Sequence, residues 1–216
     1  CIRDSTWPMY GAAGNKSGQS GRPGLVLVLA LLLALLSVGC RSVDPVVKVG
    51  LVAPFEGRHR AVGYDVLYSA RLAVRQLNAA GGIDGTRVAL VALDDSGSTE
   101  FAAATADSLI IDPNVVAVIG HWLPETTAAA EPQYAGSGLA LIAGGDAPFL
   151  PTDPQRLSAE FVEAYTAVTP FDETPGPYAG PAYEAYQSLW RVLEEAQKQH
   201  GAITRATVLQ TLNGLE

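Results

Sequence analysis

Hydrophobic and polar positions repeat in two alternating patterns from residue 46 onward. Short, almost wholly apolar runs predict β-strands, and between them the apolar residues return every three or four positions, which predicts helices. In the first helical stretch, for example, Val66, Ala70 and Ala73 share one face. The predicted strands are residues 46–53, 87–93, 115–119 and 139–143. Strands that alternate with helices predict a parallel sheet with helices on both faces.

The strand order follows from the handedness of the connections. Once the third strand lies beside the first, right-handed crossovers require the order 2-1-3-4. The predicted fold class is therefore α/β: a doubly wound, Rossmann-like parallel sheet in three α/β/α layers. Ligands bind such sheets outside the carboxyl ends of the strands. The loops after Ala53, Gly120 and Ala143 are where we expect a site.

The pattern changes after residue 145. Three prolines, Pro148, Pro151 and Pro154, indicate a crossing loop, and helices are predicted at 159–168 and 182–199, with a last helix capped by Thr204. We expect the helices at 159–168 and 182–199 to pack on the sheet. The prediction is one domain, residues 46–216, with βα units in 46–145 and returning helices in 146–216.

The N-terminal stretch has the pattern of an export signal. Leu25 to Leu36 is an unbroken apolar run, preceded by the cations Lys16 and Arg22 and followed by small residues. The run is shorter than the ~20 residues that span a bilayer. A charged region, an apolar region and small residues before a cleavage site are typical of a secretory signal. Residues 1–40 are predicted to be this signal region, and 41–45 a short tether.

The end of that stretch, LLSVGC, resembles the lipobox of bacterial lipoproteins. The resemblance implies that Cys40 is lipidated and anchors the protein to a membrane outside the cytoplasm. Ser37 departs from the pattern, which usually has Leu three positions before the cysteine. An ordinary cleaved signal and an uncleaved anchor are the alternatives.

Charge and motifs exclude several function classes. The net charge is −8 and there is no basic stripe, so nucleic acid is not an expected partner. His59, His121 and His200 are scattered, and no metal site is expected. The chain has no glycine-rich nucleotide motif and no GxSxG motif, and neither catalysis nor a cofactor is predicted. Asp95, in the pair that follows the second strand, is expected to accept hydrogen bonds from loop backbone.

Three segments carry a family resemblance. KVGLVAPFEG, then NAAGGIDG followed by a strand and a DD pair, then VVAVIGH, are similar to the first lobe of type 1 periplasmic solute-binding proteins, the receptors of branched-chain amino acid and related ABC importers. FVEAYTAVTPFDETPGPYAGPAYEAY resembles the later segment in which the family returns to lobe one. The resemblance covers about 46–213 and implies a small, polar, amino acid-like ligand and an ABC permease as partner. The family's second lobe would lie between these parts and is not found.

The resemblance also implies the site. The family's ligand meets the loops after strands three and four and a helix N-terminus, which suits a carboxylate. Thr126 and Thr127 could add hydroxyl donors, whereas Glu125 would repel a carboxylate or serve only the helix dipole. Trp122 could stack on a ligand or partner, or cover an apolar surface. The candidate ligand-binding residues are Phe55, Glu56, Trp122, Thr126, Thr127, Gly144 and Gly145.

Two functions follow from a single lobe. The first is a solute-binding lipoprotein of an importer. The second is a single-lobe interaction or sensor module, or the product of a shortened or degenerate gene, without tight ligand binding. One lobe offers only half a site, so we expect dissociation constants of roughly millimolar or weaker for amino acids. A homodimer through the mouth that carries Phe55, Trp122 and Gly145 would supply the missing wall.

Overall fold

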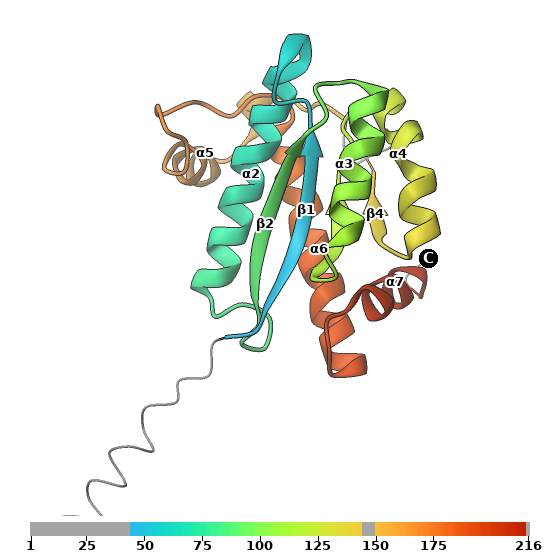
Figure 1. The fold of residues 1–216 in the computed structure, drawn as a ribbon. Coiled ribbons are helices and arrows are strands. Elements are labelled where there is room, and N and C mark those ends of the chain that lie inside the picture. Colours follow the sequence, from blue (N-terminus) through green and yellow to red (C-terminus); the bar gives the residue numbers. More distant parts are fainter. Residues whose placement is uncertain (1–43, 144–149, 215–216) are drawn as a thin grey trace, which may run out of the picture. The chain divides into compact units, whose positions relative to one another are not determined.

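The computed structural model describes residues 44–143 and 150–214. Its centre is one parallel sheet of four strands in the order β2-β1-β3-β4, as predicted (Figure 1). The strands are β1 (Val46–Ala53), β2 (Arg87–Asp94), β3 (Val115–Ile119) and β4 (Ala140–Ile142). β3 lies inside the sheet and is buried at every position, as expected of a strand that helices cover on both faces.

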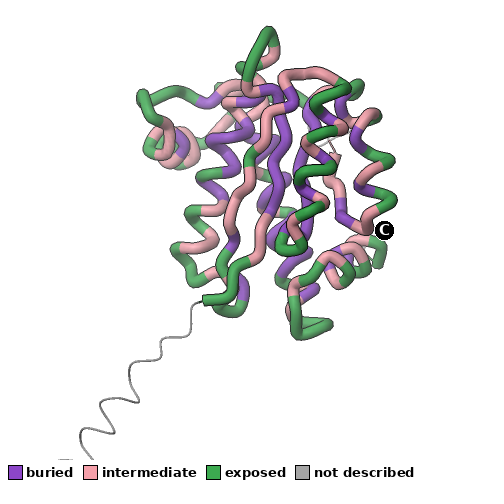
Figure 2. Tube along the Cα trace, viewed as in Figure 1, coloured by how far each residue is buried: buried purple, intermediate pink, exposed green. Residues whose placement is uncertain are grey.

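Helices cover both faces of this sheet, which confirms the three-layer α/β/α fold. Val49 and Leu51 of β1 pack with helices α2 and α6, whereas Val52 packs with α3 and α4 on the other face. This alternation is the two-residue period of a strand. Figure 2 shows the buried positions along the strands and the inner sides of the helices. The helices are α2 (Arg60–Ala79), α3 (Thr99–Ile111), α4 (Pro124–Ser137) and α6 (Ala179–His200).

Shorter helices lie in the connecting segments and after α6. The 3-10 helices η1 (Gly57–His59) and η2 (Pro154–Arg156) lie in loops, and α7 (Arg205–Asn213) follows α6. Thr204 caps α7 as predicted, because its hydroxyl accepts from the N–H of Thr207, and the Thr207 hydroxyl accepts from the N–H of Thr204.

Helix α5 (Ala159–Thr166) does not pack on the sheet, so that expectation is wrong. Its buried residue Tyr165 instead contacts Tyr68 and Leu72 on the outer side of α2, and the rings of Tyr68 and Tyr165 meet edge to face at 6.0 Å. The reason is space: α2 and α6 already cover that face of the sheet, so the eight-residue α5 packs outside these helices, where its Phe161 also meets Tyr183 of α6 at 5.2 Å.

Two glycines bring the loops at the carboxyl ends of the strands close to their neighbours. A side chain at Gly120, where φ is +132°, would lie 2.2 Å from the carbonyl oxygen of Val52. A Cβ atom at Gly63 in α2 would lie 2.2 Å from the carbonyl oxygen of Pro54. Real Cβ atoms do not approach so closely, so both positions require glycine. The loop after β3 therefore lies directly against β1.

Several predictions concern residues outside the described ranges. They are the predictions for the signal region with Cys40, for the tether up to residue 43, and for Gly144 and Gly145. Among the described residues, no helix combines the length and the apolar character needed to cross a membrane.

Candidate functional site

The loops after β1 and β2 are joined by the carboxylate of Asp94. One oxygen, Oδ1, accepts from the N–H of Phe55 at 2.7 Å and from that of Ser96 at 2.8 Å, and Oδ2 accepts from the Ser96 hydroxyl at 2.7 Å. Partial burial alone would raise the pKa of Asp94, but these hydrogen bonds outweigh it and hold the pKa below its usual value. The carboxylate is therefore ionised at neutral pH and holds the two loops together.

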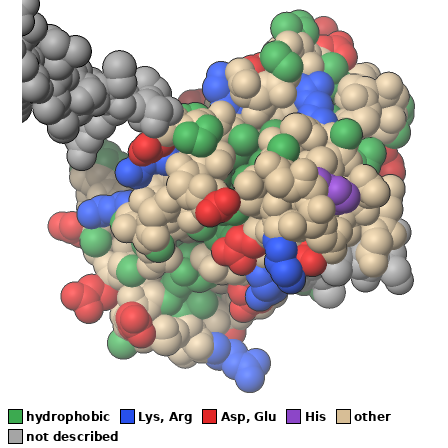
Figure 3. Space-filling view, turned by 90° about the horizontal axis from the view of Figure 1, so that it is seen from below, with side chains coloured by type: hydrophobic (Ala, Val, Ile, Leu, Met, Phe, Trp, Pro, Cys, Tyr) green, Lys and Arg blue, Asp and Glu red, His purple; other side chains and the backbone are tan. Residues whose placement is uncertain are grey.

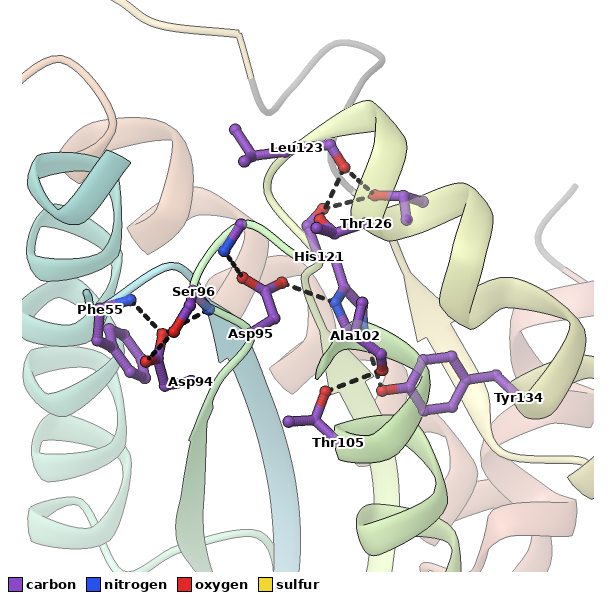
Figure 4. A network of polar contacts seen from close by, with 12 residues as sticks. Phe55, Asp94, Asp95, Ser96, Ala102, Thr105, His121, Leu123, Thr126 and Tyr134 are labelled. Atoms are coloured by element: carbon purple, nitrogen blue, oxygen red, sulfur yellow. Dashed lines mark hydrogen bonds and ion pairs between the residues drawn. The ribbon is translucent and has the colours of Figure 1, made fainter. Parts of the chain in front are cut away.

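A second carboxylate joins the loops after β2 and β3. Asp95 is fully buried; its Oδ1 accepts from the N–H of Gly97 at 2.9 Å, which confirms the expected loop contact. Its Oδ2 lies 2.9 Å from Nδ1 of His121, which is also fully buried. The other ring nitrogen, Nε2, lies 3.3 Å from the hydroxyl of Tyr134 in the third turn of α4 (Figure 4). Three elements thus meet through side chains that solvent does not reach.

Tyr134 takes part in this network as a protonated phenol. Burial raises the pKa of Tyr134 well above its usual value, and the nearby charge of Asp95 raises it further. Its hydroxyl therefore remains an O–H group at physiological pH and can donate a hydrogen bond.

The start of helix α4 is the part of this edge best suited to a ligand. The N-cap residue, Leu123, has no side chain that could bond the first turn, and the first N–H groups of a helix have no partner within it. Pro124 carries no N–H, so the open donors are the amides of Glu125 and Thr126. Such an end attracts an anion. Glu125 is exposed in the same turn, where its charge favours the helix.

The two threonines of this turn use their hydroxyl protons within the protein. Thr126 is buried, and its hydroxyl donates to the carbonyl of Leu123 at 3.0 Å. The Thr127 hydroxyl donates to the carbonyls of His121 at 2.8 Å and Leu123 at 3.0 Å. The expectation that these hydroxyls donate to a ligand is therefore corrected. Their part in binding stays a prediction, restricted to backbone groups and to oxygen acceptors.

Trp122 lies in the core. It is 6% exposed, and its ring meets that of Tyr178 edge to face at 6.4 Å. This corrects the expectation of an exposed aromatic ring at the mouth, and with it the picture of a dimer contact through Trp122. Contact between Trp122 and a ligand stays a prediction.

Of the remaining candidates, the structure describes two, in the loop after β1. Phe55 is half-buried against the core, and Glu56 is exposed at the start of η1. Gly144 and Gly145 follow β4, outside the described residues. In the described ranges, no group of three or more His, Cys, Asp or Glu side chains is placed to hold a metal ion.

Sequence reasoning missed the contact between Asp95 and His121. The signal was present: Asp95 directly follows β2 and His121 nearly follows β3, and although β1 lies between these strands, the carboxyl ends of parallel strands share one edge of the sheet. The histidine had been weighed only as a metal ligand.

The fold is an α/β lobe built on one parallel sheet, and the candidate site lies at the carboxyl edge of that sheet. A family model described as "Periplasmic binding protein" matches residues 46–155, and the chain belongs to this family. The family is one of solute-binding proteins rather than of enzymes.

Relatives and solved structures agree with this assignment. The chain is 32% identical to an "Amino acid binding protein" of Pseudomonas aeruginosa over 50% of its own length, and 28% identical to "Leu/Ile/Val-binding protein homolog 2" of Brucella abortus over 71%. The matches span only 28% and 40% of those relatives. The fold is that of the branched-chain amino acid transporter substrate binding protein LivJ from Streptococcus pneumoniae, with a TM-score of 0.64, 16% identity and coverage of 77% of this chain and 87% of that one.

Proposed function

We propose that residues 46–216 form a solute-binding lobe of an ABC-type importer, which takes an amino acid or a similar small polar solute. The observation that carries the proposal is the uncapped first turn of α4 at the carboxyl edge of the sheet. Open N–H groups and the positive end of the helix dipole are suited to the carboxylate that every amino acid carries. The names of the relatives, which refer to amino acids and to Leu, Ile and Val, support the same class of ligand.

The other walls of the site would come from the neighbouring loops. Phe55 and Glu56 after β1, Trp122 after β3, and Gly144 and Gly145 after β4 are the proposed contacts beside the turn of Thr126 and Thr127. An ABC permease is the proposed partner. The proposed location is outside the cytoplasm, with a lipid on Cys40 as anchor.

A single-lobe interaction module is the second candidate. The observation that favours it is the acidity of the site: Glu125 is exposed in the turn where the carboxylate would bind, and Glu56 is exposed in the loop after β1. Like charges in that position weaken the binding of an anion. In this case a second copy of the chain or another protein would cover the mouth.

Calorimetry and NMR titration of the full chain with leucine, isoleucine, valine and polar amino acids test the first candidate, with light scattering alongside. We expect weak binding, roughly millimolar. Glu125→Gln should tighten it several-fold, because it removes a charge near the carboxylate, and Glu131→Gln, farther along the same helix, should not. A chain that binds no amino acid up to about ten times that concentration and forms a dimer would favour the second candidate. Micromolar binding by a strict monomer would refute the expectation of a half-site.

The anchor is tested separately. Metabolic labelling with a palmitate analogue should mark the wild-type protein and not Cys40→Ser. Equal labelling of both proteins would contradict a lipid on Cys40.

A further inference from the structure

One assignment of protons satisfies both hydrogen bonds that join the buried side chains of Asp95, His121 and Tyr134. Carboxylate oxygens are hydrogen-bond acceptors, so the 2.9 Å contact between Oδ2 of Asp95 and Nδ1 of His121 assigns the proton of this hydrogen bond to Nδ1. The Tyr134 hydroxyl lies 3.3 Å from Nε2, and within the described ranges it has no other acceptor. It therefore donates to Nε2. A second ring proton on Nε2 would leave the buried phenol proton without a partner, which folded proteins avoid.

We infer that Asp95, His121 and Tyr134 form a positioning relay, which holds His121 as the uncharged Nδ1–H tautomer and fixes the first turn of α4 against the loop after β2. Two members of the relay, Asp95 and His121, make further hydrogen bonds to the loops. Asp95 also accepts from the N–H of Gly97, and the backbone carbonyl of His121 accepts from the Thr127 hydroxyl in the α4 turn. His121 thus connects the loop after β2, through its ring, to the turn of α4 where a solute carboxylate is proposed to bind, through its backbone carbonyl. The binding part of this inference rests on the proposed function.

The other ionisable groups of these loops have different partners. Asp94 accepts from Phe55 and Ser96, His59 accepts from the Arg58 side chain at 2.7 Å, and Glu125 is exposed. In the described part of the chain, the ring of His121 is therefore held by Asp95 and Tyr134 alone.

The chain provides a matched pair of substitutions. Tyr134→Phe removes one hydroxyl from the relay. Tyr186→Phe removes one from an equally buried tyrosine in α6, whose hydroxyl has no hydrogen-bond partner among the described residues. Both variants keep the ring and its packing, so any difference between them reports the hydrogen bond to His121.

The first readout is the ¹⁵N spectrum of the histidine rings in the full-length chain at neutral pH. We expect His121 to show a protonated Nδ1 and an Nε2 that accepts a hydrogen bond. In Tyr134→Phe the Nδ1 proton should persist, because Asp95 still accepts it, while the Nε2 signal moves to that of a nitrogen without a donor. Tyr186→Phe should leave both signals unchanged. A wild-type ring protonated on Nε2, or an Nε2 signal that Tyr134→Phe does not move, would overturn the relay.

The second readout is an NMR titration with L-leucine. We expect Tyr134→Phe to weaken binding about tenfold and Tyr186→Phe less than twofold, since the loss of one buried hydrogen bond has effects of that size. Equal affinity in both variants would show that the relay does not position the site. If the wild type binds no leucine but its ring has the expected tautomer, the proposed function fails and the structural relay stands.

Discussion

The two ends of the sheet satisfy their polar groups in different ways. At the carboxyl end, Asp95 and His121 are fully buried and bond to each other and to Tyr134. At the amino end, Arg205 of α7 donates to backbone carbonyls at the end of α3 and the start of β3, and Lys48 pairs with Asp112 near the surface. Figure 3 shows this end, where acidic, basic and apolar side chains are mixed.

The helix N-termini at the two ends differ in the same sense. α7 is closed by a reciprocal pair of hydrogen bonds between Thr204 and Thr207, whereas the N-cap of α4, Leu123, provides none. The amino end completes its own hydrogen bonds and needs no ligand. The carboxyl end buries a side-chain network under a helix start that it leaves open. The closed start of α7 therefore serves the fold alone, whereas the open start of α4 is the one proposed to bind a ligand.

The largest effect is expected from Asp95→Ala. It leaves Nδ1 of His121 buried without an acceptor and removes the acceptor of the partly buried Gly97 N–H, so we expect the free energy of unfolding to fall by about 3 kcal/mol. Urea unfolding measures it. Asp107→Ala, at an exposed position of α3, is the control and should change little. A loss below about 1 kcal/mol would contradict this prediction, because it would show that hydrogen-bonding groups at the carboxyl end can lose their partners at as little cost as groups on the protein surface.

At the amino end, Arg205→Met should cost somewhat less, about 2 kcal/mol. The guanidinium donates to the carbonyls of Val115 at 2.8 Å and Ile110 at 2.9 Å, but those carbonyls lie nearer to water than Asp95 does. Amide exchange should also quicken in α7. Arg191→Met, whose guanidinium bonds only Ser188 of its own helix, is the control. If Arg205→Met destabilises more than Asp95→Ala, the comparison of the two ends is reversed.

The fold was predictable because its signals are local. The run Val115–Ile119 is a strand with the predicted bounds, and the order of the sheet follows from the handedness of the crossovers. Errors concern short elements. β4 has three residues, Ala140–Ile142, rather than the five expected, and α5 packs on a helix because the sheet face was already covered. The hydrophobic periodicity of those segments predicts neither the length of β4 nor the packing partner of α5.

The site was predictable only to the level of loops. The sequence identified the loops after β1 and β3, but the direction of each side chain depends on packing between distant segments. His121 meets Asp95 across a separation of 26 residues, and Trp122 turns inward to Tyr178 of the returning segment. The threonine hydroxyls donate to the carbonyls of Leu123 and His121 in their own loop, a choice of partner that residue type alone does not predict.

The third prediction concerns the closed helix start. Thr204→Ala removes the cap of α7 and should lower the free energy of unfolding by about 1 kcal/mol in urea. Ser98→Ala is the matched control, because Ser98 occupies the N-cap of α3 but its side chain makes no capping bond. Equal losses in the two variants would show that the reciprocal bonds of α7 contribute nothing beyond the residue type.

The smallest expected effect is a difference between the two ends in how their stability depends on pH and on salt. The pKa of Asp112 is lowered by the hydrogen bond from Lys48 and by further contacts, and that of Asp94 is lowered because hydrogen bonds outweigh its partial burial. A carboxyl group whose pKa is lower in the folded state contributes stability above its unfolded value, 3.8, and loses it as the pH falls through the folded value. As the pH falls below about 4, the free energy of unfolding should therefore decrease less in Asp94→Asn and in Asp112→Asn than in the wild type.

Salt should distinguish these two contributions. Asp112 is partly exposed and has a charged partner, Lys48, so about 1 M salt should screen its contribution. Asp94 accepts from N–H groups and a hydroxyl, which are uncharged, and its contribution should persist. Urea unfolding between about pH 2 and pH 7, at low and high salt, measures both. If salt reduced the contribution of Asp94 as much as that of Asp112, the carboxyl end would be held by charge in the same way as the amino end, and the contrast between them would not extend to Asp94.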